Sequence, residues 1–257
     1  MIETSSDILL PQKRPLFKRL LRAGLVFLAV TLLLPLLTIL LLRFLPVPTT
    51  SFMIQKRIAF WRGKSKTSVI YRWTRWEQIP RHVALAVVAA EDQKFPFHRG
   101  FDWEGIAEAQ ERNRRGRRLR GGSTITQQTA KNLFLWPKKS YIRKALEAYF
   151  TVLLETLWPK QRILHVYLNI AEFGDGIYGI GAAADRLFKK QPRELTRHEA
   201  ALLAAVLPSP KRLHADRPSP YVRERAEWIL GQMEMLGDNY LDFNPTSSRQ
   251  RRNRPHR

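Results

Sequence analysis

Residues 83–100, VALAVVAAEDQKFPFHRG, begin as an apolar, helix-forming run and end in two adjacent acids, Glu91 and Asp92. Acids are the scarcer charge in this chain, which has 44 Lys and Arg residues against 22 Asp and Glu residues. A carboxylate at the end of a buried apolar helix loses solvation, which raises its pKa and makes it a better general base. The alternative is that both acids cap the helix or pair with arginines. The spacing by itself leaves both interpretations of Glu91 open.

The helical pattern continues beyond this run. One segment starts at a good N-cap, Ser140, and ends before Pro159. In another, Thr196 and Glu199 have the spacing of a capping box. No segment has convincing strand alternation, and no internal repeat is visible. The pattern predicts a mostly helical region from about residue 78 to residue 236.

An uncharged apolar stretch, Ala23–Leu42, lies near the N-terminus. As a helix it would span roughly 30 Å, the thickness of the hydrocarbon core of a bilayer. We therefore predict a single transmembrane helix over residues 23–43. Basic residues precede it, so the positive-inside rule predicts a cytoplasmic basic tail over residues 1–22 and a body on the other side of the membrane. A cleaved signal peptide is the alternative, but the apolar stretch is long for one and no clear cleavage site follows.

Composition suggests three further segments. Residues 44–77 are predicted to be a membrane-proximal linker segment, because prolines open it and tryptophans and basic residues follow. For its aromatic part, residues 53–76, a place in an aromatic core is an equally open alternative. Residues 238–257 are predicted to be a basic disordered tail. The stretch Gln110–Gly121, QERNRRGRRLRG, has no apolar face and is predicted to be a mobile loop. It is either simply solvated or in contact with anionic groups.

The net charge of +22 indicates an anionic partner: nucleic acid, anionic lipid or a phosphate-bearing substrate. The predicted anchor makes nucleic acid the weaker choice and lipid phosphates the stronger one. Cysteine is absent, so the chain has neither disulfides nor thiolate chemistry and fits any redox compartment.

Glu147 is a second candidate for chemistry. Arg143 and Lys144 precede it by four and three residues, so the three side chains share one face of a helix. A surface ion pair is the simpler interpretation. The alternative is a site for a polyanion with an acid beside it.

A third candidate is GGSTITQQTAKN, residues 121–132. Its two glycines allow close approach of a ligand to the backbone, and the amides at the start of a helix favour phosphate. The spacing is not that of a Walker loop, and an ordinary polar helix start is the alternative. No histidine or cysteine spacing typical of a metal site occurs. His98, near Glu91, is the one histidine of interest, and a structural hydrogen bond is the simpler role for it.

Five segments resemble, in order, the five conserved blocks of the peptidoglycan glycosyltransferases. They are AAEDQKFPFHRGFD (89–102), RGGSTITQQTAKNLF (120–134), RKALEA (143–148), KQRILHVYLN (160–169) and RHEAALLAA (197–205). The family comprises the glycosyltransferase domains of bifunctional penicillin-binding proteins and the monofunctional enzymes. The resemblance covers about residues 78–237, and only a short segment follows. We therefore expect a monofunctional biosynthetic transglycosylase.

The resemblance implies an all-α, lysozyme-like, two-lobed domain beside the single transmembrane helix. It also implies that Glu91 is the general base and that Glu147 assists near a leaving pyrophosphate. Positions that match the donor and pyrophosphate region are Ser123, Thr124, Gln128, Lys131, Asn132, Arg143 and Lys144. Positions that match supporting residues of the first and fourth blocks are Asp92, Phe95, His98, Gly100, Tyr167 and Asn169.

The implied reaction is polymerisation of lipid II into linear β-1,4 glycan strands, with inversion at the anomeric carbon and release of undecaprenyl pyrophosphate. The implied partners are lipid II, the growing glycan-lipid chain, membrane lipids and other cell-wall or division proteins, with no nucleic acid. The implied location is the bacterial cytoplasmic (inner) membrane, with the catalytic domain outside the cytoplasm. No cofactor is required by the resemblance. A divalent cation, Mg²⁺ or Mn²⁺, remains an option, although the sequence contains no dedicated cage for it.

Two other classes of protein fit parts of this pattern. A lysozyme-like hydrolase would share the fold and a catalytic glutamate, but it would need no cationic site for pyrophosphate. A membrane-tethered binder of nucleic acid or another anionic polymer would explain the net charge of +22 but not the ordered blocks. Turnover of lipid II distinguishes the glycosyltransferase from both.

Overall fold

The computed structural model describes residues 14–107 and 122–243, without the side chains of residues 14–17, 27–29 and 31–32. The stretch Gln110–Gly121, predicted to be a mobile loop, and residues 244–257 of the predicted tail lie outside the described residues. The chain divides into two units, Met1–Phe44 and Leu45–Arg257. The helices whose bounds both lie within the described residues are α1 (Arg14–Leu42), α2 (Ser51–Trp61), η1 (Trp76–Gln78), α3 (Arg81–Glu91), α5 (Ile125–Phe134), α6 (Tyr141–Leu157), α7 (Lys160–Ile170), α8 (Ile180–Ala183), η2 (Ala184–Phe188), η3 (Pro192–Glu194), α9 (Arg197–Val206), α10 (Pro220–Leu236) and η4 (Asp238–Leu241). The strands are β1 (Ile70–Tyr71), β2 (Glu172–Gly174) and β3 (Ile177–Tyr178).

In the first unit, α1 is a continuous helix that contains Pro35. Within the described part of the chain, no helix has the combination of length and apolar character needed to cross a membrane. The transmembrane helix over residues 23–43 therefore stays a prediction.

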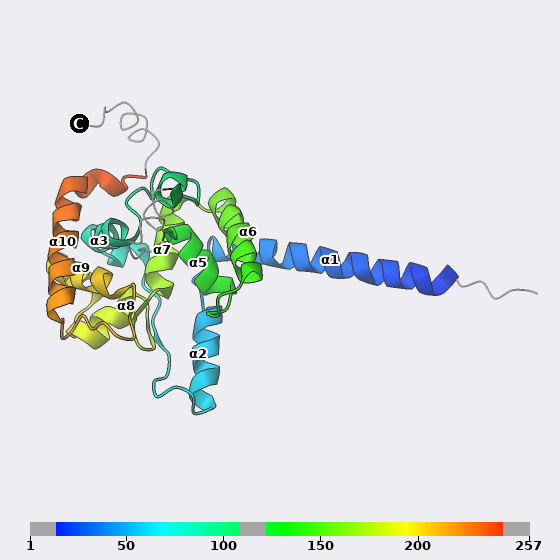
Figure 1. Ribbon diagram of the computed structural model, residues 1–257, viewed down its shortest axis with the longest axis horizontal. Coiled ribbons are helices and arrows are strands. Elements are labelled where there is room, and N and C mark those ends of the chain that lie inside the picture. The colour runs from blue at the N-terminus through cyan, green and yellow to red at the C-terminus, as the bar shows by residue number, and fades with distance from the viewer. Residues whose placement is uncertain (1–13, 108–121, 244–257) are drawn as a thin grey trace, which may run out of the picture. The chain divides into compact units, whose positions relative to one another are not determined.

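The second unit is mostly helical, as predicted, and α3 is central to its core. Every residue from Val83 to Ala89 is buried, which is the pattern of a helix covered on all sides. Its main neighbours are α9 and α10, and the three helices lie together in Figure 1. Alanines predominate in α9, so its backbone can approach α3 closely. This packing places the C-terminal end of α3, and with it Glu91, beside α10.

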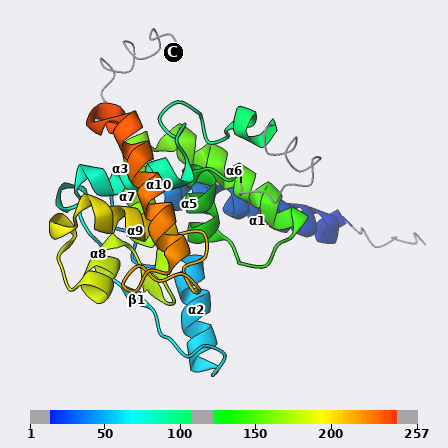
Figure 2. The ribbon, with the colours of Figure 1, turned by 60° about the vertical axis from the view of Figure 1, so that its left-hand side comes forward.

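A second group is formed by α5, α6 and α7, with α5 in contact with both of the others (Figure 2). The predicted N-caps are confirmed: Ser140 caps α6, and Thr196 forms a capping box with Glu199 in α9. The sequence left Ser or Thr open as the cap of α5, and the structure places Thr124 there.

The described residues also contain a small sheet that the sequence pattern did not indicate. Its order is β1–β3–β2, with β1 parallel and β2 antiparallel to β3. The strands have only two or three residues, too few to show alternation. Gly176, in the β2–β3 turn, has φ +80°, and a Cβ there would lie 2.3 Å from the Ser68 carbonyl oxygen. Only glycine fits this turn.

The segment 44–77, predicted to be a linker, contributes α2, β1 and η1 to the second unit. Its firmest attachment is to Asn169, which is fully buried on α7. The Asn169 side chain accepts a hydrogen bond from the Thr74 amide (2.7 Å) and donates to the carbonyls of Thr74 (3.0 Å) and His165 (2.9 Å). One side chain thus satisfies both backbone groups of Thr74.

Asn169→Ala is expected to lower the free energy of unfolding by about 2 kcal/mol, because it leaves the buried amide of Thr74 without its partner, whereas the Thr74 carbonyl keeps its contact with His165 Nε2 at 2.9 Å. Chemical denaturation of the purified protein measures this loss. Gln161→Ala, an exposed position on the same helix, is the matched control and should change stability by less than about 0.5 kcal/mol. Equal effects of the two substitutions would contradict a stabilising role for the hydrogen bonds between Asn169 and Thr74.

Candidate active site

Glu91 is the last residue of α3, and its side chain is half-buried. The Gln128 amide donates a hydrogen bond of 2.8 Å to its Oε2. Burial raises the pKa of Glu91 above its usual range, against the lowering effects of the Gln128 hydrogen bond and of the charges of Arg225 and Lys131. A half-buried carboxylate with a raised pKa and one fixed donor is suited to accept a proton.

Gln128 was expected from the resemblance to line the pyrophosphate region, and the structure places it against Glu91. The Tyr167 hydroxyl donates to Gln128 Oε1 at 3.0 Å. Tyr167 is 1% exposed, and burial raises its pKa well above the usual range, so it stays a neutral donor. Because Tyr167 occupies the amide oxygen, the amide nitrogen of Gln128 faces Glu91. A chain of two hydrogen bonds therefore orients the carboxylate.

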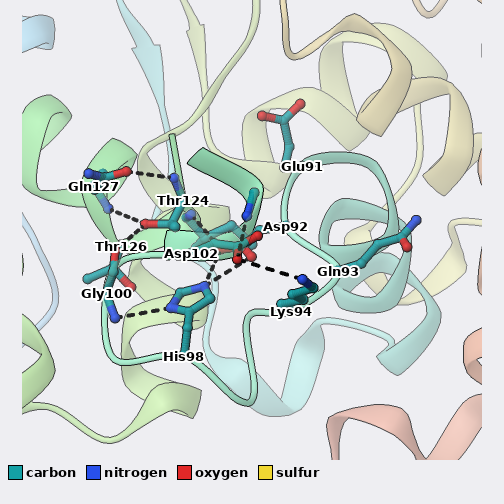
Figure 3. A network of polar contacts seen from close by, with 12 residues as sticks. Glu91, Asp92, Gln93, Lys94, His98, Gly100, Asp102, Thr124, Thr126 and Gln127 are labelled. Atoms are coloured by element: carbon teal, nitrogen blue, oxygen red, sulfur yellow. Dashed lines mark hydrogen bonds and ion pairs between the residues drawn. The ribbon is translucent and has the colours of Figure 1, made fainter. Parts of the chain in front are cut away.

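Asp92, next in sequence, has a different environment (Figure 3). Its Oδ2 accepts a hydrogen bond of 2.9 Å from the amide of Ile125, the first residue of α5. His98 Nε2 lies 3.0 Å from both carboxylate oxygens. In Figure 3 the Glu91 carboxylate points away from this network. Asp92 therefore fastens the end of α3 to the positive end of the α5 dipole, and Glu91 remains available.

The tautomer of His98 follows from its second contact. The Gly100 amide donates to Nδ1 of His98 at 3.0 Å, so this nitrogen carries no proton. Nε2 must then carry the proton and donate it to Asp92. Gly100 has φ +87°, and a Cβ there would lie 2.7 Å from Thr151 Cγ2, so the turn requires glycine.

The start of α5 is stabilised by hydrogen bonds of its own side chains. The Thr124 hydroxyl oxygen accepts a hydrogen bond from the Gln127 backbone amide, and the Gln127 side-chain oxygen accepts one from the Thr124 backbone amide. The Thr124 hydroxyl donates to the Gly100 carbonyl at 2.7 Å, and the residue is buried. Thr124, matched by resemblance to a donor-binding position, thus uses its side chain inside the fold, while Ser123 before it is half-buried. Gln127 was not singled out from the sequence, although the Thr-x-x-Gln spacing of a capping box signals it.

Glu147 lies on α6 and is 3% exposed. Arg143 donates to its Oε2 at 2.6 Å, and Lys144 donates to its Oε1 at 2.5 Å. Arg143 is also buried, whereas the Lys144 side chain is 52% exposed. The predicted shared face is confirmed, but a buried carboxylate held by two cations is not a surface ion pair. Arg143 Nε is buried and has no hydrogen-bond partner within the described residues.

Lys131 links the two acids. It lies on α5, where burial lowers its pKa below the usual range. The opposing, raising influences come first from Glu147 and then from Glu91, while Arg143 adds to the lowering. The charges of both glutamates therefore act on the pKa of this one lysine, and the next residue, Asn132, is half-buried.

A cluster of polar and aromatic side chains supports the loop that follows Glu91, and most of its members were not predicted from the sequence. Lys160 donates to Glu155 Oε1 at 2.8 Å, and Thr126 donates to the same oxygen. The Lys160 ammonium lies 4.5 Å from the centre of the Phe95 ring, which is fully buried. These contacts join α5, α6 and α7 to the loop after Glu91. Their partners are distant in sequence, so no local pattern signals them.

Comparisons with known proteins agree on one family. The sequence profile of the family described as Transglycosylase matches residues 62–234. A biosynthetic peptidoglycan transglycosylase of Pasteurella multocida is 50% identical over 205 residues, which cover 79% of this chain and 83% of the relative. One of Pseudomonas aeruginosa is 48% identical over 229 residues, covering 89% and 97%. One of Xylella fastidiosa is 44% identical over 245 residues, covering 95% and 98%.

Proposed function

The chain belongs to the transglycosylase family and is a peptidoglycan glycosyltransferase of cell-wall synthesis, and from this premise we propose that Glu91 is its general base and that Glu147 organises the leaving-group site. The observation that carries the proposal is the position of α5: its residue Gln128 bonds Glu91 at 2.8 Å, and it packs against α6, on which Glu147 holds two cationic side chains. A proton acceptor at the end of α3 and a cationic patch on α6 thus both lie next to α5. This pairing is what transfer of a sugar from a pyrophosphate requires.

In the proposed reaction the substrate is lipid II. Glu91 takes the proton from the acceptor sugar 4-hydroxyl, and that oxygen attacks the anomeric carbon of the growing glycan-lipid chain. The bond from that carbon to the pyrophosphate oxygen breaks, and its electron pair leaves with undecaprenyl pyrophosphate. A single displacement inverts the anomeric carbon and gives the β-1,4 linkage, by analogy with inverting hydrolases. The raised pKa of Glu91 matches the base to this task.

The leaving pyrophosphate gains negative charge as the bond breaks. We assign its stabilisation to Lys131, Arg143 and Lys144, of which Arg143 and Lys144 bond Glu147 directly. Glu147 holds Arg143 and Lys144 in place before the substrate arrives, so little reorganisation is needed during the reaction. An arriving phosphate would raise the pKa of Lys131, which burial lowers.

The donor set does not fit a dedicated divalent cation. Both oxygens of Glu147 are engaged by cationic side chains. Among the described residues, no group of three or more His, Asp or Glu side chains is placed to hold a metal ion. No step of the proposed reaction is therefore assigned to Mg²⁺ or Mn²⁺.

Polymerisation of labelled lipid II by the purified full-length protein tests the function. Gel analysis should show linear glycan strands whose formation stops with moenomycin, an inhibitor of the family. Release of soluble fragments from purified cell wall, without strand synthesis, would instead indicate a hydrolase and overturn the proposal.

We further propose a single-pass location in the bacterial cytoplasmic membrane, with residues 1–22 cytoplasmic, and a lysozyme-like, two-lobed arrangement of the catalytic domain. The uncharged sequence Ala23–Leu42 and its basic N-terminal flank support the anchor. Replacing Leu33 and Leu37 together by Arg is expected to move the protein from the membrane fraction to the supernatant. The matched control replaces two exposed leucines outside the stretch, Leu20 and Leu45. Equal membrane retention of both double variants would contradict the anchor.

A further inference from the structure

The end of α3 is fastened by a helix that lies outside the five blocks. Arg225 on α10 donates a hydrogen bond of 3.2 Å to the Ala90 carbonyl, in the last turn of α3. Gln232, also on α10, accepts a hydrogen bond of 2.9 Å from Gln93. The carbonyls of a last helical turn have no partner within the helix, so a cationic donor there satisfies one of them and complements the helix dipole. These contacts hold the residues on both sides of Glu91.

The Arg225 guanidinium is itself restrained. It lies 3.9 Å from the centre of the Trp228 ring, one turn further along α10. A guanidinium stacked on an indole has fewer orientations than a free arginine side chain. Its positive charge is thus held in one place, beside the last turn of α3.

Several groups face Glu91 from the elements packed around it. Those whose charge or titration acts on it are Lys131 on α5, Tyr167 on α7, Arg225 on α10 and its own neighbour Asp92. Arg225 lowers the pKa of Glu91 more than Lys131 does, whereas Asp92 raises it. Among the described residues, Arg225 is therefore the cation with the largest lowering effect on the pKa of the proposed base.

We propose that Arg225 is a positioning residue of the transferase: it fixes the C-terminal turn of α3 and places a restrained positive charge beside the Glu91 carboxylate. The proposal rests on the function assigned to Glu91 as base. Arg225 contacts the backbone next to Glu91 and acts through that residue. Burial alone would keep Glu91 protonated at higher pH, and Arg225 opposes this effect.

The test is the pH dependence of lipid II polymerisation by Arg225→Gln and Arg225→Lys. A base works when deprotonated, so the rate falls as pH falls through the pKa of Glu91. Removing the positive charge raises that pKa, so the acidic limb of the profile should move up by about one pH unit in Arg225→Gln. The rate should return close to that of the wild type at higher pH. Arg225→Lys, which keeps the charge, should restore most of the profile.

Arg223→Gln is the matched control, because Arg223 is an exposed arginine on the same helix and bonds the Pro218 carbonyl. Its acidic limb should not move. A rate depressed equally at every pH in Arg225→Gln would mean a merely structural role and overturn the proposal, as would an unchanged profile. These outcomes differ from failure of the base itself, in which Glu91→Gln keeps a near-normal rate whatever Arg225 does.

Discussion

Glu91→Gln is expected to lower the rate of lipid II polymerisation by about a thousandfold, in the range typical of loss of a general base. The substitution preserves the shape of the side chain, and the new amide oxygen can still accept the hydrogen bond that Gln128 now gives at 2.8 Å. Only the ability to take up the proton is removed. Single-turnover or initial-rate assays with labelled lipid II measure the loss.

Two further variants test whether the loss of rate is due to the Glu91 carboxylate itself. Glu91→Asp retains a carboxylate but shortens its reach, so it should keep part of the activity. Glu234→Gln removes an exposed acid from α10 and should polymerise at the rate of the wild type. Thermal unfolding of Glu91→Gln should match that of the wild type to within a few degrees. A near-normal rate in this folded variant would refute the role of Glu91 as base.

Glu147→Gln is expected to reduce polymerisation by about a hundredfold or more and also to destabilise the protein by roughly 3 kcal/mol. The substitution removes the charge that holds Arg143 and Lys144 at 2.6 and 2.5 Å. It also removes the strongest influence that keeps Lys131 charged, so the pKa of Lys131 should fall further. Initial rates and chemical denaturation of the same preparation separate the two effects.

A double variant distinguishes charge balance from the need for the carboxylate itself. Lys144→Gln combined with Glu147→Gln removes one charge of each sign, and Lys144 is half exposed. Stability should recover in large part, whereas activity should not. Recovery of chain growth in the double variant would show that Glu147 only neutralises excess positive charge.

Much of the helical framework was predictable because its signals are local. Ser140, Thr196 and Glu199 mark helix starts through their own side chains and the amides that follow. By contrast, α2 was missed within the predicted linker, although Thr50 caps it in the same way. The prolines just before it favour extended backbone, so the sequence pattern indicated a linker rather than a helix. The sheet escaped notice because β1 and β3 pair across a long stretch of sequence and are too short to show a period.

In the candidate site, too, the local features were predictable from the sequence and the contacts between distant segments were not. The helical spacing of Arg143, Lys144 and Glu147 predicted that they share a face, because i, i+3 and i+4 positions are neighbours on any helix. Spacing could not predict how deeply Glu147 is buried. Nor could it predict that Gln128 bonds Glu91, or that Arg225 bonds Ala90 from 135 residues away. Such contacts depend on how α3, α5 and α10 pack, and no local pattern carries that information.

The attachment of Thr74 to Asn169 has a practical consequence for producing the enzyme. A catalytic fragment cut at residue 78, where the motif-bearing region begins, would lack β1 and would leave the Asn169 amide with no Thr74 to bind. The second compact unit begins at Leu45. A fragment for inhibitor screening or crystallisation should therefore start there, because a shorter one would expose buried backbone of α7 and β3 and would be prone to aggregate before any compound is tested.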